Sequence, residues 1–145
     1  MRSIIVAGEP GGSITSTRNA LEKAWPNSTI FDHHGMTEVG PVTYQCPNKA
    51  GLLHVLENAY FPEIIDSNTN KAVQPGEVGE LVLTTLGRYG SPLIRYKTGD
   101  LVKSSEIKRC SCASSANSTH FANAAQSAAF ANRAAALANT ARRSW

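Results

Sequence analysis

Long apolar runs, clustered charge and an export signal are all missing from this sequence. No apolar stretch approaches the roughly 20 residues that a membrane-spanning helix needs, so no membrane association is expected. The first eight residues are too few and too mixed for the apolar part of a secretory signal. The sequence therefore predicts a cytoplasmic protein whose three cysteines are reduced.

An excess of charge of one sign is also missing from most of the chain. Residues 1–112 hold 11 of the 14 Lys and Arg residues and all 11 Asp and Glu residues, so this part is formally neutral. The remaining positive charges are Arg133, Arg142 and Arg143. A nucleic-acid partner is not expected, because binding to a phosphate backbone requires clustered positive charge.

Acidic residues, glycine and proline are absent from residues 113–145, where 13 of the 33 residues are alanine. Alanine favours helix, but a segment so poor in large side chains buries little apolar surface. We expect a frayed helix or a disordered tail. A slip of the reading frame after Cys112 is an alternative origin for the abrupt change in composition.

The first 45 residues alternate strand, helix and strand patterns. Short apolar runs occupy residues 4–7 and 29–32, and Ser13 is a suitable N-cap for the helix between them. A βαβ unit pairs its strands in parallel, and ligands of parallel sheets sit at the carboxyl ends of the strands. The loops at 8–12 and 33–38 both follow such ends.

Short β-prone runs separated by turn signals dominate residues 46–112. The pattern predicts strands at 52–55, 60–65, 79–85 and 92–96. The expected fold class is therefore α/β. A partial βαβ unit over 1–45 precedes a small β-rich, barrel-like segment over 46–112, and the Ala-rich tail over 113–145 follows.

Two short segments carry groups suited to nucleotide chemistry. In the loop at 33–38, Gly35 permits close backbone approach, Thr37 can donate to a phosphate oxygen, and Glu38 can hold Mg²⁺ beside that phosphate. Asp100, after Gly99, can accept hydrogen bonds from a ribose diol. Each segment alone is more typical of an ordinary turn than of a nucleotide site, since turns use Gly, Thr and Asp.

Four segments in this order closely resemble the phenylacetate–CoA ligase family of the adenylate-forming (acyl-CoA synthetase) superfamily, and the likeness covers about residues 1–112. They are Gly-Glu-Pro at 8–10, Gly-Met-Thr-Glu at 35–38, the run from Gly76 to Leu86, and Arg-Tyr-Lys-Thr-Gly-Asp at 95–100. Gly-Leu-Leu-His at 51–54, the run 60–66 and the pair Cys110 and Cys112 point to the same branch. The family activates a carboxylic acid with ATP to an acyl-adenylate, releases pyrophosphate, and transfers the acyl group to coenzyme A. The resemblance therefore implies a piece from the late part of the large AMP-binding domain.

The resemblance also implies roles for individual residues. Thr37 would contact the α-phosphate and Glu38 would bind Mg²⁺, as the catalytic groups. His34 would stack on adenine where relatives often have an aromatic ring, and Asp100 would hold the ribose hydroxyls. The other nucleotide-binding residues would be Gly8, Glu9, Pro10, Gly35 and Met36, and those bordering the acyl pocket would be Val39, Gly40 and Pro41.

Two parts of the family pattern are missing from the sequence. A Ser/Thr/Gly-rich phosphate loop does not precede residue 8, and the expected hinge and catalytic-lysine domain do not follow Cys112. Catalysis in this class depends on positioning and on neutralising charge around the transferred group. We therefore expect no acyl-CoA synthesis by this chain alone. A non-catalytic AMP- or zinc-binding module and a vestigial, frame-shifted product are the alternatives.

The three cysteines and one histidine also form a candidate metal site. Cys46, His54, Cys110 and Cys112 make a Cys₃His set suited to structural Zn²⁺, and some relatives resemble this chain at these positions. The Cys-x-Cys spacing is tighter than usual for zinc, and free cysteines also serve as small buried apolar groups. Zinc ligands and unligated thiols both remain open from the sequence.

Overall fold

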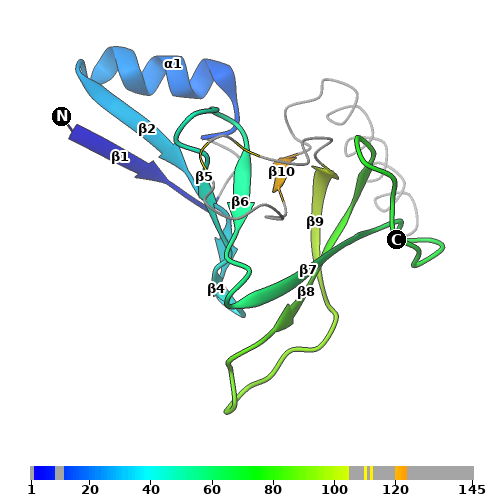
Figure 1. The fold of residues 1–145 in the computed structure, drawn as a ribbon. Helices are drawn as coiled ribbons and strands as arrows, with labels where there is room; N and C mark the ends of the chain where they lie inside the picture. Colours follow the sequence, from blue (N-terminus) through cyan, green and yellow to red (C-terminus); the bar gives the residue numbers. More distant parts are fainter. Residues whose placement is uncertain (1, 9–11, 105–109, 111, 113–119, 124–145) are drawn as a thin grey trace, which may run out of the picture.

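The computed structural model describes residues 2–8, 12–104, 110, 112 and 120–123. Among these residues it has one helix and three separate sheets (Figure 1). None of its described helices has the length and apolar character needed to cross a bilayer. The elements are β1 (Arg2–Val6), α1 (Thr15–Ala24), β2 (Ser28–Asp32), β3 (Gly35–Met36), β4 (Gly40–Pro41), β5 (Thr43–Gln45), β6 (Leu53–Val55), β7 (Tyr60–Ile65), β8 (Val78–Thr85), β9 (Tyr96–Ser104) and β10 (His120–Asn123).

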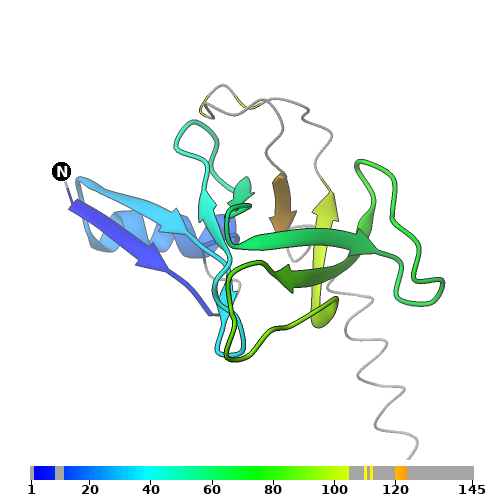
Figure 2. The ribbon, with the colours of Figure 1, turned by 60° about the horizontal axis from the view of Figure 1, so that its bottom comes forward.

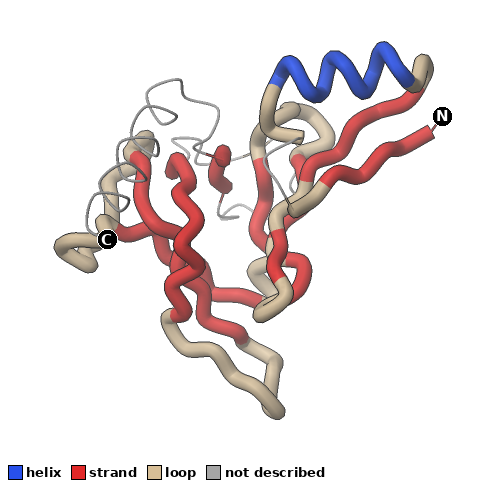
Figure 3. Tube along the Cα trace, turned by 180° about the vertical axis from the view of Figure 1, so that it is seen from behind, coloured by secondary structure: helices blue, strands red, loops and turns tan. Residues whose placement is uncertain are grey.

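The predicted βαβ unit is present. Strands β1 and β2 pair in parallel, with Val6 opposite Asp32, and α1 lies along one side of the pair (Figure 3). The unit is thinly covered, because Ile30 is fully buried while Ile5 and Trp25 are 70% and 52% exposed. Its two strands nevertheless end side by side, so the loops that follow them leave from the same edge of the sheet.

The N-cap prediction for Ser13 is wrong. The helix begins at Thr15, Ile14 occupies the cap position, and no side chain caps the first turn. The Ser13 hydroxyl instead donates to Asp32 Oδ2 at 2.8 Å. Because a buried carboxylate without a donor costs more than an uncapped exposed helix end, the hydroxyl is better used on Asp32.

The β-rich part forms one six-stranded sheet in the order β5-β6-β10-β9-β8-β7, and its neighbouring strands pair antiparallel. Figure 2 shows β10 lying beside β9 in this sheet. The apolar faces of the strands build one core with the loop before β5; its buried members are Val39, Val42, Leu53, Val55, Tyr60, Leu81, Leu83 and Val102. The strand-rich α/β prediction is confirmed.

One predicted strand is misplaced. The sequence predicts a strand at 92–96, but β9 begins at Tyr96 and the residues before it form a loop. Leu93 lies against β8 instead, because its amide bonds to Thr85 Oγ1 at 3.0 Å and its carbonyl accepts from the Thr85 amide at 2.9 Å. Arg95 has a φ of 49°, a left-handed conformation that interrupts an extended strand.

The tail also differs from the expected helix or disorder over the four residues that the structure describes beyond Cys112. Residues His120–Asn123 form β10, which pairs with β6 on one side and β9 on the other. Facing edges of β6 and β9 present backbone groups that need partners, and an extended segment satisfies both edges where a helix cannot. The remaining tail residues lie outside the described part.

Candidate functional site

The Gly35–Pro41 segment forms a tight hairpin, as its glycines require. Gly35 pairs with Pro41 and Met36 with Gly40, and the turn between the strands carries Thr37 and Glu38 at its exposed tip. A Cβ on Gly35 would lie 2.8 Å from the Gly40 carbonyl oxygen, closer than real Cβ atoms come. Position 35 therefore requires glycine because its backbone lies close to the Gly40 carbonyl of the same hairpin.

The hairpin reaches the body of the sheet at two carbonyls. Tyr60 donates its hydroxyl to the Val39 carbonyl at 2.6 Å, and Arg88 donates Nη1 to the Glu38 carbonyl. Val39 is itself buried in the core, whereas Pro41 is exposed. Of the three residues predicted to border an acyl pocket, Val39 therefore packs in the core and anchors the hairpin to it.

His34 and Asp100, predicted on separate elements, touch each other. His34 Nε2 lies 2.9 Å from Asp100 Oδ2, and the side chains are 16% and 50% exposed. The His34 amide donates to Thr43 Oγ1 at 2.7 Å, and the His34 carbonyl accepts from the amides of Val42 and Thr43. The loop before the hairpin is thus fixed to β5 while its imidazole reaches β9.

Asp100 occupies an irregular point of β9 rather than a turn after the strand. The β8–β9 register shifts between Glu80 and Val82, and Gly99 has a φ of 77°. Thr98 holds this irregularity, because its hydroxyl donates to the Leu81 carbonyl at 2.8 Å and accepts from the Asp100 amide at 3.1 Å. A bulge re-aims the side chain that follows it. Gly99 therefore allows the irregular backbone conformation, and Asp100 is the side chain that this irregularity re-aims. The sequence alone did not predict this arrangement.

The two predicted nucleotide loops start from neighbouring strand ends. Val6 and Asp32 are register partners, and the His33 amide donates to the Val6 carbonyl at 3.1 Å. Gly8 follows β1 with a φ of 94° and is exposed. The predicted adenine-side residues Glu9 and Pro10 lie outside the described residues.

A buried polar network beneath these loops was not predicted from the sequence. Asp32 accepts from Ser13, and its amide donates to Gln45 Oε1 at 3.2 Å. Arg18 donates to the same Gln45 oxygen at 2.5 Å and to the Ile30 carbonyl at 2.8 Å. Burial raises the pKa of Asp32, against the opposing effects of the Ser13 hydrogen bond and the Arg18 charge. The sequence feature that could have indicated this network is Asp32, an acidic residue at the end of an apolar strand.

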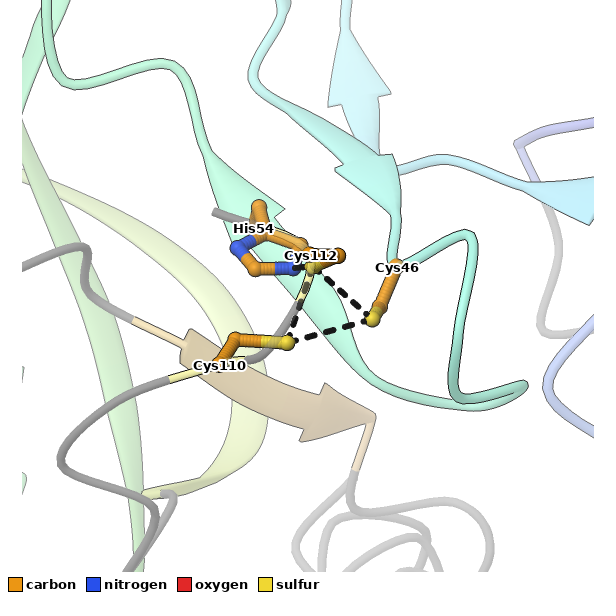
Figure 4. A group of neighbouring side chains, drawn as sticks. All are labelled: Cys46, His54, Cys110 and Cys112. Carbon is orange, nitrogen blue, oxygen red and sulfur yellow. Dashed lines mark hydrogen bonds between the residues drawn. The ribbon is translucent and has the colours of Figure 1, made fainter. Parts of the chain in front are cut away.

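The four predicted metal ligands converge on one point (Figure 4). The ligand atoms of Cys46, His54, Cys110 and Cys112 all lie within 4.8 Å of one another, and this is the one such group of three or more among the described residues. Cys46 follows β5, His54 lies on β6, and the other two lie between β9 and β10. Cys46 and His54 are fully buried. Four residues from three parts of the chain thus share one small volume.

The distances within this cluster fit thiols gathered around a common centre. The sulfur–sulfur distances are 2.8 Å for Cys110 and Cys112, 3.2 Å for Cys46 and Cys112, and 3.4 Å for Cys46 and Cys110. His54 Nε2 lies 3.0 Å from the Cys112 sulfur. A tetrahedron with Zn–S bonds of about 2.3 Å has sulfur–sulfur edges of about 3.8 Å, so the sulfurs would separate by about 0.4 to 1.0 Å to hold an ion.

Hydrogen bonds within the cluster shift the pKa values of two thiols in opposite directions. Hydrogen bonding from Cys112 lowers the pKa of Cys110, and the same contact raises the pKa of Cys112 to about 12. Thiolate is the form of cysteine that ligates metal. Tyr44 stacks on His54 with ring centroids 5.0 Å apart and an interplanar angle of 13°. The donor set and its aromatic cover therefore suit a structural metal ion.

Comparison with known proteins gives the same family as the sequence motifs. No protein-family model matches the chain. The phenylacetate-coenzyme A ligase of Thermus thermophilus is 40% identical over 70 residues, which are 47% of this chain and 16% of that protein. The enzyme of the same name from Aromatoleum evansii is 36% identical over 91 residues, 61% of this chain and 21% of that protein. The chain thus matches about a fifth of the length of these relatives.

The fold has a solved counterpart. The structure of 2-hydroxyisobutyryl-CoA ligase, in an open conformation with 2-HIB-AMP and CoA, superposes with a TM-score of 0.73. The match covers 84% of this chain and 26% of that one at 21% identity, which demonstrates a shared fold. Sequence and fold together show that this chain is related to part of the phenylacetate–CoA ligases, within the adenylate-forming acyl-CoA ligases.

Proposed function

We propose that this chain carries part of the ATP/AMP site of a carboxylate–CoA ligase. The observation that carries the proposal is the 2.9 Å contact between His34 and Asp100, which brings the loop of residues 33–38 to the bulge of β9. These are the two segments that the family resemblance assigns to adenine and phosphate on one side and to ribose on the other. Such convergence is what a single bound adenosine monophosphate requires.

The residues fit these roles to different degrees. Asp100 is half exposed and can accept from ribose hydroxyls. Thr37 and Glu38 stand exposed at the hairpin tip, where a hydroxyl can donate to the α-phosphate and a carboxylate can bind Mg²⁺. Glu38 belongs to no cluster of metal ligands among the described residues, so phosphate oxygens and water would supply the other Mg²⁺ ligands.

The complete reaction would need more than this chain. In the proposed reaction a carboxylate attacks the α-phosphorus of ATP, pyrophosphate leaves, and the coenzyme A thiol then displaces AMP from the acyl-adenylate. The chain matches only about a fifth of the length of the ligases to which it is similar. We therefore expect AMP binding without acyl-CoA synthesis by the isolated chain.

Titration calorimetry with AMP tests the binding proposal. Asp100→Asn should weaken AMP binding about tenfold, because a charge-assisted hydrogen bond at a half-exposed site contributes about 1.4 kcal/mol. Glu22→Gln is the matched control, since Glu22 is an exposed carboxylate on α1. Absence of AMP binding by the parent chain, or equal affinity of parent and Asp100→Asn, would refute the proposal.

A structural zinc site is a second function favoured by its own observation, the Cys₃His cluster. Bound zinc would supply a cross-link between the β5–β6 hairpin and the segment after β9. We expect close to one zinc per chain by elemental analysis of the purified protein. Cys46→Ser should lower that content sharply, and a metal-free parent protein with unchanged folding would exclude the site.

A further inference from the structure

The cysteine cluster and the strand β10 are connected through one residue. His54 contributes Nε2 to the cluster, and its backbone is the register partner of His120 in β10. Cys110 and Cys112 lie on the connection between β9 and β10. The connection therefore contacts the side chain of His54 at Cys112 and returns to the backbone of the same residue at His120.

Among the described residues, β10 is the strand whose backbone pairing joins the two halves of the six-stranded sheet. The order β5-β6-β10-β9-β8-β7 places it between the β5–β6 hairpin and β9. Phe121 pairs with Leu53 of β6 and with Ser104 of β9. Without β10, β6 and β9 would each lose a neighbour, and the backbone pairing between the two halves of the sheet would be interrupted.

The two halves also carry opposite sides of the candidate nucleotide site. His34 is fixed to β5 through Thr43, and Asp100 lies on β9. Their 2.9 Å contact spans the same boundary that β10 bridges. The pairing of β10 with β6 and β9 should therefore also affect the position of His34 relative to Asp100.

We propose that metal binding at Cys46, His54, Cys110 and Cys112 and insertion of β10 are one coupled event, so that the metal acts as the latch that joins the two halves of the sheet. The inference rests on the proposed zinc site. The four ligands come from the residue after β5, from β6 and from two residues between β9 and β10, and they are gathered only when Cys110 and Cys112 lie beside Cys46 and His54. A ligand that binds the gathered state stabilises every contact formed only in that state.

The size of the effect follows from chain closure and linkage. Pinning the connection at Cys112 replaces closure from Ser104 to His120 by closure from Cys112 to His120, about half the length. This alone favours insertion about threefold. Zinc at about 100 times its dissociation constant adds about a hundredfold in favour of the gathered state.

Hydrogen–deuterium exchange on the unmodified full chain is the primary test. Saturating zinc should slow exchange of the amides at 120–123 at least tenfold relative to apo protein, and should slow those of the facing residues in β6 and β9. The amides of Leu81–Leu83, central to β8, serve as the internal reference for global folding.

A substitution in β10 tests the same coupling from the other end. Ala122→Pro removes an amide from a central strand, so zinc affinity should fall about tenfold, by reciprocity of the coupling. Ala122→Ser keeps the amide and should retain the parent affinity. Elemental analysis and a competition titration with a chromogenic chelator measure zinc binding directly.

The outcomes distinguish the proposed coupling between metal binding and β10 insertion from the metal site on which it rests. Slower exchange at 120–123 with zinc, together with weaker zinc binding by Ala122→Pro alone, supports the latch. Zinc binding with unchanged exchange and equal affinity in both variants overturns the latch and leaves the metal site standing. Failure of the parent chain to bind zinc overturns both.

Discussion

Replacing His34 by phenylalanine is expected to tighten AMP binding. In the structure His34 Nε2 lies within hydrogen-bond distance of Asp100 Oδ2, at 2.9 Å. That carboxylate is the group proposed to bind the ribose hydroxyls. Phenylalanine cannot form this contact, so the carboxylate becomes available. It also presents an aromatic face at the position that the family resemblance assigns to adenine stacking.

The magnitude follows from the two contacts. The His34–Asp100 hydrogen bond is worth about 0.5 to 1 kcal/mol, because the side chains are 16% and 50% exposed and solvent weakens the interaction. Stacking of an aromatic ring on a base contributes about 1 kcal/mol or more. Because His34 and phenylalanine both present a ring to the base, His34→Phe gains mainly the freed carboxylate and should lower the Kd for AMP about 2- to 5-fold. His34→Ala, which frees Asp100 but loses the ring, should stay within about threefold of the parent.

Titration calorimetry of the parent and both variants against AMP measures the effect. The control is His33→Phe, the same chemical change one position earlier. The His33 amide donates to the Val6 carbonyl, and among the described contacts it is the His34 ring that reaches Asp100. A His34→Phe variant that binds AMP no more tightly than the parent would refute the reasoning. In that case the imidazole either bridges to the nucleotide or lies away from it.

Three further perturbations have directions fixed by the structure. Gly35→Ala should destabilise the chain by about 1 to 3 kcal/mol in urea unfolding, because the new Cβ would lie 2.8 Å from a carbonyl oxygen; Gly87→Ala, with no atom within 4 Å, should be nearly neutral by comparison. Burial raises the pKa of Asp32 above 3.8, so folding gains from its protonation at low pH and loses that gain as the pH rises through the raised pKa. Asp32→Asn should flatten this decline in unfolding titrations at several pH values, and an unchanged slope would contradict the assignment. Zinc at about 100 times its Kd should raise the melting temperature by about 5 to 10 °C in calorimetry, and Cys46→Ser should abolish the shift.

The elements that the sequence predicted well are those with strong local patterns. The strand at Tyr60–Ile65 is found where the β-prone run predicts it, and β8 extends the predicted run at 79–85 by one residue. The βαβ unit follows from two apolar runs flanking a helical segment. In each case the deciding information lies within a few residues, where side-chain type and turn residues act directly on the backbone.

The predictions that failed depended on distant partners. Ser13 donates to Asp32 across the βαβ unit instead of capping its own helix. The segment before Tyr96 bonds to Thr85 of β8 rather than extending β9. Residues 120–123 become a strand because β6 and β9 present open edges, although the alanine-rich tail that contains them favours helix.

The family relationship, the candidate nucleotide residues and the candidate Cys₃His set could be named from the sequence alone, because each rests on residue types in a fixed order along the chain. Only the tertiary structure decided that His34 reaches Asp100, that Val39 is buried beneath the hairpin, and that one strand from the tail bridges the sheet beside the cysteines. These are contacts between residues far apart in the chain, made where backbone hydrogen bonds and buried polar groups must find partners. Local sequence records the need for a partner but not which distant residue meets it.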